Sequence, residues 1–217
     1  MPISRTRFFL LLGVAAYICS CAQPPDPGYL ELQRSREAIR EATSWQIDTT
    51  AQYPGGQPVI VELSKVDRPG RMDRLAILRE PRNKSVHEMW FDGTHYNKTE
   101  GVAVWISHPA NENPFPDCGR GPSLIWDGTL YDDLATVHKV GDIRRGTTDQ
   151  YDDVSCVWWE VTPYKGSTPH YKACVGQTDH LPRLVNSLEH DLHYMYTLSK
   201  WNATVITLPP EAKVIPN

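Results

Sequence analysis

Hydrophobic positions follow a helical period near residue 30 and a strand period after it. Between residues 28 and 43, small and apolar side chains recur every three or four positions along one stripe, formed by Leu32, Ser35, Ile39 and Ala42. Asp26 followed by Pro27 is typical of an N-cap and a first helical turn. The pattern predicts an amphipathic helix that ends near residue 43 and needs a surface to cover its stripe.

From residue 45 the period changes to two, as expected of β-strands. Turn residues interrupt this alternation at Pro54-Gly55-Gly56, Asp92-Gly93 and Glu100-Gly101. The predicted strands are residues 45–50, 59–63, 71–79, 86–91, 94–98, 102–107, 143–147, 155–162, 169–175, 190–198 and 201–208. A helix followed by many sequential antiparallel strands belongs to the α+β class.

A second helix is predicted after a Pro-rich loop at residues 108–122. Thr129 and Asp132 form a capping pair, and Gly141 is typical of a helix C-terminus. We therefore expect a helix over about residues 129–140.

The first 21 residues have the layout of an export signal. Two arginines precede an apolar run at residues 8–18, which is too short for a stable membrane span. The run ends at Ile18-Cys19-Ser20-Cys21, which resembles the bacterial lipobox, and the small Ser20 makes Cys21 the expected lipidation site. An ordinary signal peptide with a chance cysteine is the alternative.

Lipidation of Cys21 would divide the chain into three parts. Residues 1–20 are the signal peptide, residues 21–27 the lipidated cysteine with a Pro-rich tether, and residues 28–217 a single domain. Acyl chains such as palmitate would anchor the domain, each buried CH₂ contributing roughly 0.8 kcal/mol. Ala22 stands where an inner-membrane retention signal has Asp, so in a host with two membranes we expect the outer membrane, facing the periplasm.

Composition and charge narrow the function classes. The 217 residues carry a formal net charge of -4, with a pI of about 6.0, so the chain lacks the basic balance of a nucleic-acid-binding protein. No metal-ligand spacing, phosphate-binding glycine loop or nucleophile elbow occurs in the sequence. We expect no nucleic-acid partner, no metal, no cofactor and no enzymatic activity.

Two cysteines flank a predicted hairpin. If Cys156 faces Cys174, the hairpin closes at Tyr164-Lys165-Gly166, where the glycine supplies the positive φ of the turn. Exported proteins enter an oxidising compartment, and facing strand residues lie within disulfide reach, so we expect a Cys156–Cys174 disulfide. Two half-buried thiols, or a bridge from one of them to Cys118, are the alternatives. In the favoured pairing Cys118 stays unpaired.

Several predicted strands are apolar on both faces, as in residues 156–161. A sheet with one solvated face would alternate cleanly. Two explanations stay open, a core packed on both sides of the sheet or a curved sheet whose inner face lines an apolar cavity covered by helices.

The order of elements and several short signatures resemble the LolA/LolB-like superfamily of lipoprotein carriers. The signatures are Trp45-Gln46-Ile47-Asp48, Asp67-Arg68-Pro69, Asp92-Gly93-Thr94-His95-Tyr96, Gly101-x-x-x-Trp105, His180-Leu181-Pro182-Arg183 and Trp201-Asn202. The resemblance implies a curved antiparallel half-barrel sheet, with the N-terminal helix and the second helix covering its concave face. It also implies a cavity that binds acyl chains or other apolar groups.

The expected function is that of a lipid-anchored cell-envelope lipoprotein that binds an apolar ligand, a lipid or an acylated peptide, in the half-barrel cavity. The residues expected to line this cavity are Leu32, Ile39, Val59, Val61, Leu63, Trp105, Leu134 and Trp159. The alternative is a structural or sensing envelope lipoprotein whose interior is filled and which docks a protein partner. A hydrolase is the weakest hypothesis, because no nucleophile and base can be paired from the sequence.

Overall fold

The computed structural model describes residues 26–78, 84–110, 141–162, 171–189, 192–208 and 215–216. One helix, α2 (Pro27–Glu41), precedes the strands. The strands are β1 (Ser44–Gln52), β2 (Val59–Asp67), β3 (Arg71–Leu78), β4 (Lys84–Phe91), β5 (Thr94–Thr99), β6 (Ile106–Pro109), β7 (Asp142–Tyr151), β8 (Val154–Thr162), β9 (Tyr171–Gly176), β10 (Pro182–Glu189), β11 (Leu192–Ser199) and β12 (Ile215–Pro216).

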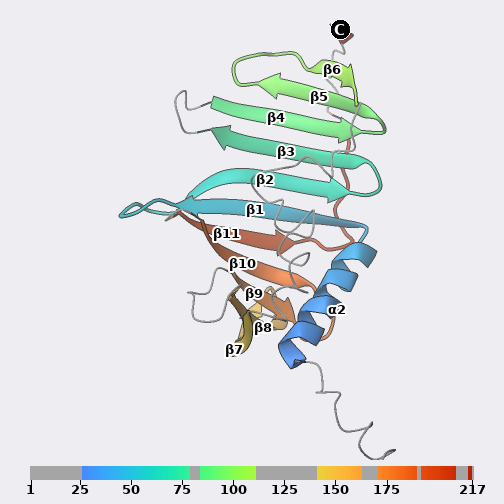
Figure 1. The fold of residues 1–217 in the computed structure, drawn as a ribbon. Coiled ribbons are helices and arrows are strands. Elements are labelled where there is room, and N and C mark those ends of the chain that lie inside the picture. Colours follow the sequence, from blue (N-terminus) through green and yellow to red (C-terminus); the bar gives the residue numbers. More distant parts are fainter. Residues whose placement is uncertain are drawn as a thin grey trace, which may run out of the picture.

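The described strands form one open sheet in the order β12-β6-β5-β4-β3-β2-β1-β11-β10-β9-β8-β7 (Figure 1). Neighbours from β6 to β7 pair antiparallel, and the two-residue β12 pairs parallel with β6. Strand β1 pairs with β2, which follows it in the chain, and with β11, which comes much later. The pairing of β1 with β11 joins the two ends of the domain into one sheet.

The expected cap of the first helix is confirmed. The Asp26 carboxylate accepts hydrogen bonds from the backbone N–H groups of Gly28 (2.7 Å) and Tyr29 (3.2 Å). The predicted stripe is buried, with Leu32 and Ser35 at 0% exposure and Ile39 at 6%. At 15 residues with a polar outer surface, α2 does not meet the length and hydrophobicity of a membrane-spanning helix, and no other helix in the described part of the chain does.

The sheet has a helix-side face, which carries α2, and a far face. Trp45, Ile47 and Thr49 of β1 point to the helix side, and the residues between them point to the far face. Cross-strand partners point to the same face, and successive side chains of a strand alternate between the two faces. The assignment for β1 therefore extends to the other strands of the sheet. The main core lies on the helix side and comprises Leu32, Ile39, Ala42, Trp45, Ile47, Val66, Met72, Val157, Trp159, Val161, Ala173, Val175, Leu181, Val185, Tyr196 and Leu198.

The segment after β11 connects the two faces at one end of the sheet. The ring of Trp201 stacks on Trp45, with centroids 5.5 Å apart, on the helix side. The Asn202 side-chain oxygen accepts a hydrogen bond from the Thr43 backbone N–H at 2.7 Å. Further along, Ile206 belongs to a second, smaller cluster with Met89, Tyr96 and Trp105. Met89 and Tyr96 are a cross-strand pair on the far face, next in sequence to the helix-side Trp90 and His95.

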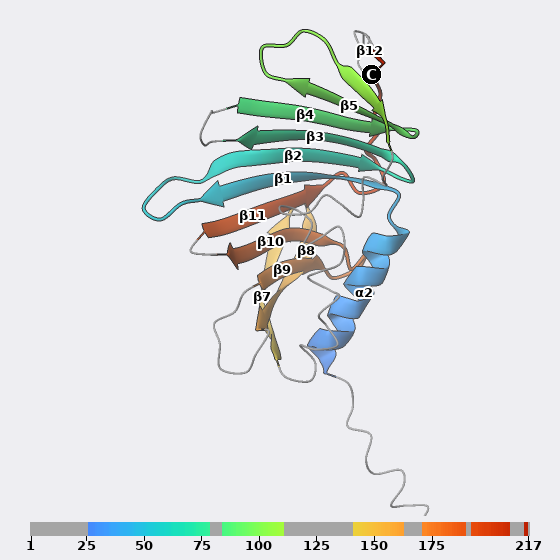
Figure 2. The same ribbon diagram turned by 45° about the horizontal axis from the view of Figure 1, so that its top comes forward.

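The tip of the β7–β8 hairpin reaches over the far face, while the start of β7, at the other end of the hairpin, lies against α2. In Figure 2 the hairpin lies behind β10. The Tyr151 side chain at its tip forms a hydrogen bond with the Thr197 side chain of β11. Burial raises the pKa of the Tyr151 phenol above its usual value, and the charge of Asp152 acts in the same direction. Strong sheet twist therefore brings the edge hairpin back over strands far from it in sheet order.

The strand predictions need four corrections. Two strands, β10 (Pro182–Glu189) and the two-residue β12 (Ile215–Pro216), are present where none was predicted, and the predicted strand at 201–208 is a turn followed by irregular chain. The last strand of the first meander begins at Ile106 rather than at residue 102. In each case local composition was a poor guide, because partner strands decide which extended segments pair. The predicted second helix and Leu134 lie outside the described residues, as do Cys21, Cys118 and the chain before residue 26.

The Cys156–Cys174 disulfide is present, with Cα atoms 5.4 Å apart and both residues at 0% exposure. The predicted register of its hairpin is wrong by two residues, because Cys156 pairs with Gly176 and Cys174 pairs with Trp158. The cysteines are diagonal neighbours on the far face. Diagonal neighbours in a twisted antiparallel pair remain close enough to be bridged, so cysteine spacing alone did not determine the register.

Candidate functional site

The residues expected to line one cavity are divided between the two faces. Leu32, Ile39 and Trp159 lie together in the helix-side core, where α2 packs on the sheet. Trp159 contributes from β8, and Ala173 of β9 is its cross-strand neighbour. Beneath α2, the described residues form a packed cluster of apolar side chains.

The expectation for β2 placed the apolar residues on the buried face, and the structure corrects it. Leu63 pairs with Asp48 and with Leu75 on the far face. The register between β1 and β2 shifts between Thr49 and Thr50, so Val61 occupies a bulge. Beyond the bulge, Val59 pairs with Ala51 and returns to the helix side.

Trp105 belongs to the second cluster on the far face. It is 4% exposed, its ring meets the His87 ring edge-on at 4.7 Å, and the Lys98 ammonium lies 6.0 Å from its centroid. The seven described residues of the expected lining are thus spread over two faces and a bulge, and they do not enclose a common volume.

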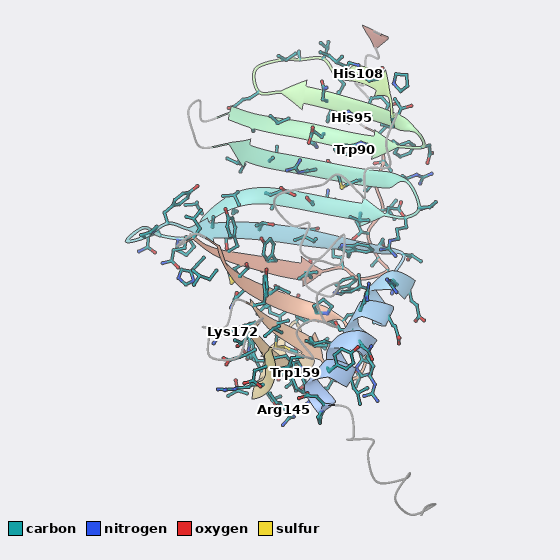
Figure 3. All side chains as sticks on the ribbon, in the orientation of Figure 1. Trp90, His95, His108, Arg145, Trp159 and Lys172 are labelled. Atoms are coloured by element: carbon teal, nitrogen blue, oxygen red, sulfur yellow. A yellow bond between two sulfur atoms is a disulfide. The ribbon has the colours of Figure 1, made fainter. Side chains whose placement is uncertain are left out.

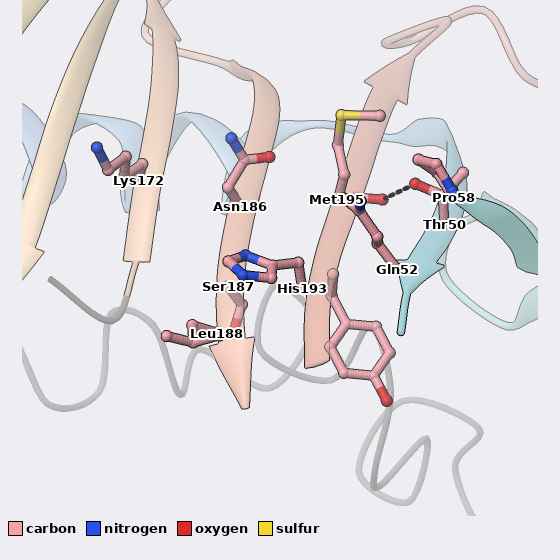
Figure 4. Close-up of a pocket in the computed structure, with 10 residues that line it drawn as sticks. Thr50, Gln52, Pro58, Lys172, Asn186, Ser187, Leu188, His193 and Met195 are labelled. Carbon is pink, nitrogen blue, oxygen red and sulfur yellow. Dashed lines mark hydrogen bonds between the residues drawn. The ribbon is translucent and has the colours of Figure 1, made fainter. Parts of the chain in front are cut away.

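A groove of about 430 Å³ lies on the far face, where β9, β10, β11 and β1 run side by side (Figure 4). Its lining residues are Thr50, Gln52, Pro58, Lys172, Asn186, Ser187, Leu188, His193, Tyr194 and Met195. A second hollow shares Gln52, Leu188 and His193 with it and continues to the β1–β2 turn at residues 53–55. Together they form a continuous depression, which we call the far-face groove.

The centre of the far-face groove is apolar and its ends are polar. Met195 and Leu188 are 40% and 36% exposed, so both present apolar surface to solvent. At one end, the Lys172 ammonium pairs with the Glu160 carboxylate at 2.5 Å. Near the middle, the Thr50 hydroxyl donates to the Met195 carbonyl at 3.5 Å. The groove was not predictable from local sequence, because most of its residues come from β9, β10, β11 and β1, and β1 joins the other three strands only through its pairing with β11.

A second arrangement lies on the helix side of β2–β5, which we call the polar row: Glu62, Ser64, Arg74, Glu88 and His95. The Arg74 guanidinium donates to Glu62 and to Glu88, each at 3.0 Å. The Ser64 hydroxyl donates to the other oxygen of Glu62 at 2.6 Å. One cation is therefore shared by two carboxylates, and the Glu62 side chain is only 8% exposed.

His95 ends the polar row. Its ring stacks on Trp90 at 4.4 Å and lies 6.4 Å from the ring of His108, and Figure 3 shows these three residues on neighbouring strands. The His95 Nε2 atom is 3.8 Å from Glu88, beyond hydrogen-bond distance. Burial lowers the pKa of His95, and His108 acts in the same direction against the opposing effect of Glu88. His95 is therefore neutral at pH near 7 and does not compensate the second carboxylate.

The polar row had a signal in the sequence. Glu62, Arg74 and Glu88 lie on three successive predicted strands, with charges that alternate in sign. Their register, in which Arg74 pairs with both Ser64 and Glu88, makes these charges neighbours. The prediction for β2 followed hydrophobicity alone and placed Val59, Val61 and Leu63 on its buried face. It therefore missed the alternating charges on the neighbouring strands.

Comparisons with known proteins give the fold. No protein-family model matches the sequence, and no curated protein does. Among solved structures, LprF from Mycobacterium bovis is 20% identical, with a TM-score of 0.59 over 87% of this chain and 99% of that chain. The Mycobacterium tuberculosis lipoprotein LppX is 14% identical, with a TM-score of 0.54 over 82% of this chain and 97% of that chain. The chain therefore shares the fold of LprF and LppX, the open curved sheet with a helix on one face that the resemblance to LolA/LolB-like carriers implied.

Proposed function

We propose that the protein is a lipid-anchored lipoprotein of the cell envelope that binds an apolar ligand, a lipid or an acylated peptide, in the far-face groove. The proposed cellular location is the outer membrane, with the domain facing the periplasm, and it rests on the export signal and on Cys21. The fold shared with the lipoprotein LppX supports a location in the cell envelope. The role is binding, and no catalytic step is proposed.

The observation that carries the proposal is the far-face groove. Its volume of about 430 Å³ lies within the range of small-ligand sites, roughly 300 to 1,000 Å³. Covering Met195 and Leu188, which are 36–40% exposed, would contribute roughly 1 kcal/mol each. Polar side chains at both ends, Lys172 and His193 among them, would orient the polar end of such a ligand.

Photocrosslinking tests the proposal. The full chain in lipid nanodiscs is incubated with a palmitate that carries a diazirine near its methyl end, irradiated and digested, and the labelled peptides are mapped by mass spectrometry. We expect labels in β10 and β11. Met195→Lys places a charge in the centre of the groove and should lower labelling about tenfold, because a charge in an apolar site costs well over 1.4 kcal/mol.

Val205→Lys is the matched control, since Val205 is 72% exposed and is not a lining residue of the groove. It should leave labelling unchanged. Labels spread evenly over the chain, or equal labelling of the two variants, would refute a ligand site in the groove. A stoichiometric protein that co-purifies with wild type and is lost from Met195→Lys would instead support the sensing or structural alternative.

A further inference from the structure

We propose that the helix-side face carries a second binding site, in which Thr49 and the polar row take a ligand with a positively charged amine. The site is separate from the far-face groove, because the two lie on opposite faces of the sheet. The inference therefore does not depend on the function proposed above.

The charge of the polar row favours a cationic ligand. Among the described residues of the polar row, Glu62 and Glu88 share Arg74 as their one charged partner, which leaves a net charge of about -1. Glu62 is 6% exposed as a residue, and a half-compensated carboxylate at such a position is costly unless a cation joins it. An ammonium group would supply that cation.

The Thr49 hydroxyl lies across the strands from the Glu62 carboxylate and is available to a ligand. Thr49 is 2% exposed, and its Oγ1 has no hydrogen-bond partner among the described residues. Thr49 pairs across the strands with Glu62, so both side chains point to the helix side. Buried hydroxyls are normally satisfied, and one without a partner marks a position where a donor from outside the protein fits. An ammonium has three N–H donors, enough for Thr49 Oγ1 and for Glu62 together.

The backbone beside Thr49 is also irregular. The register shift between β1 and β2 falls directly after Thr49. Bulges of this kind re-aim side chains and are frequent beside binding sites. Here the bulge keeps Thr49 and Glu62 on one face, while the residues beyond it change their pairing.

Calorimetric titration of the full chain in lipid nanodiscs tests the site with two probes of equal length, hexylamine and hexanol. Wild type should bind hexylamine at least about tenfold more tightly than hexanol, because one charge-assisted pair contributes on the order of 1.4 kcal/mol. Glu62→Gln keeps the size and polarity of the side chain and removes the charge. It should lower the association constant for hexylamine about tenfold.

Two further variants make the result specific. Thr49→Val removes the unpaired hydroxyl at nearly constant volume and should weaken hexylamine binding about threefold. Glu160→Gln removes one negative charge from the far face, where Glu160 pairs with Lys172, and should leave hexylamine binding unchanged. Equal affinity of wild type for the two probes, or an equal effect of Glu62→Gln and Glu160→Gln, would overturn the site.

The palmitate label separates this inference from the proposed function. Glu62→Gln should leave labelling of the groove unchanged, which also shows that the variant is folded. Loss of hexylamine binding with normal palmitate labelling in Glu62→Gln supports two separate sites. Hexylamine binding that falls in Met195→Lys as much as in Glu62→Gln would place the amine in the groove and overturn the inference.

Discussion

Two halves of one face differ in what they bury. Where β1 and β7–β11 face α2, the buried helix-side residues are mostly apolar, among them Ile47, Val185 and Leu198. On β2–β5 the same face buries Glu62 and Ser64 and carries Arg74 and Glu88. One half is thus held by apolar packing under a helix, and the other by a network of shared charges. A single sheet can therefore supply both a stable apolar core and a surface whose buried charges cost desolvation free energy. Such charged surfaces are expected at binding sites.

The apolar half should be the more sensitive to truncation. Leu32→Ala removes a side chain of α2 that is 0% exposed and leaves a cavity against the sheet, so it should lower the free energy of unfolding by about 3 kcal/mol. Urea denaturation measures the change. Leu188→Ala, at 36% exposure on the far face, should cost less than about 1 kcal/mol. Equal losses in the two variants would contradict a helix docked on the core.

The charged half should respond to loss of its shared cation. Arg74→Met leaves the buried Glu62 carboxylate without its charged partner, so it should lower the free energy of unfolding by about 2 kcal/mol. The control is Arg144→Met, because Arg144 also pairs with a carboxylate, Asp142, but is 76% exposed. That exposed pair should contribute under about 0.5 kcal/mol. If both variants unfold at the same urea concentration, the polar row is only a surface feature.

The smallest expected effect is on the free energy of unfolding at acidic pH, through His95. The lowered pKa of His95 means that the unfolded chain takes up a proton at this residue more readily than the native one. Stability from His95 is therefore complete above its usual value of 6.5 and is lost as the pH falls from there to the lowered native value. His95→Gln should reduce the loss of stability between pH about 7 and about 5, measured by urea denaturation. His193→Gln, an exposed histidine of the far face, is the control. An unchanged acid dependence in His95→Gln would show that His95 is not held neutral by the fold.

Local features of the fold were predictable because they depend on neighbours in the sequence. The Asp26 cap, the stripe beginning at Leu32 and the Asp92-Gly93 turn all follow from side chains within a few residues of one another. Asp92 and Gly93 both have positive φ, 47° and 85°, as a two-residue hairpin turn of that type requires. The choice of Cys156 and Cys174 as disulfide partners was equally local to one hairpin.

The candidate sites were not predictable in this way, because they combine residues from strands that are distant in the sequence. The groove depends on β1 pairing with β11, about 150 residues later, and on β10, which no local pattern announced. The polar row depends on which face of β2 is buried. One bulge decides that face, because the side-chain period of a strand is two and a single extra residue reverses it.

The sequence by itself predicts an export signal with a lipobox-like cysteine, and it determined the first helix and most strands, since each of these elements is encoded by contiguous residues. Only the tertiary structure decided strand register, the face on which each side chain lies and the return of the β7–β8 hairpin over the far face. Those features arise from pairing energies summed over many strands and from sheet twist, and no single segment of the chain contains that information.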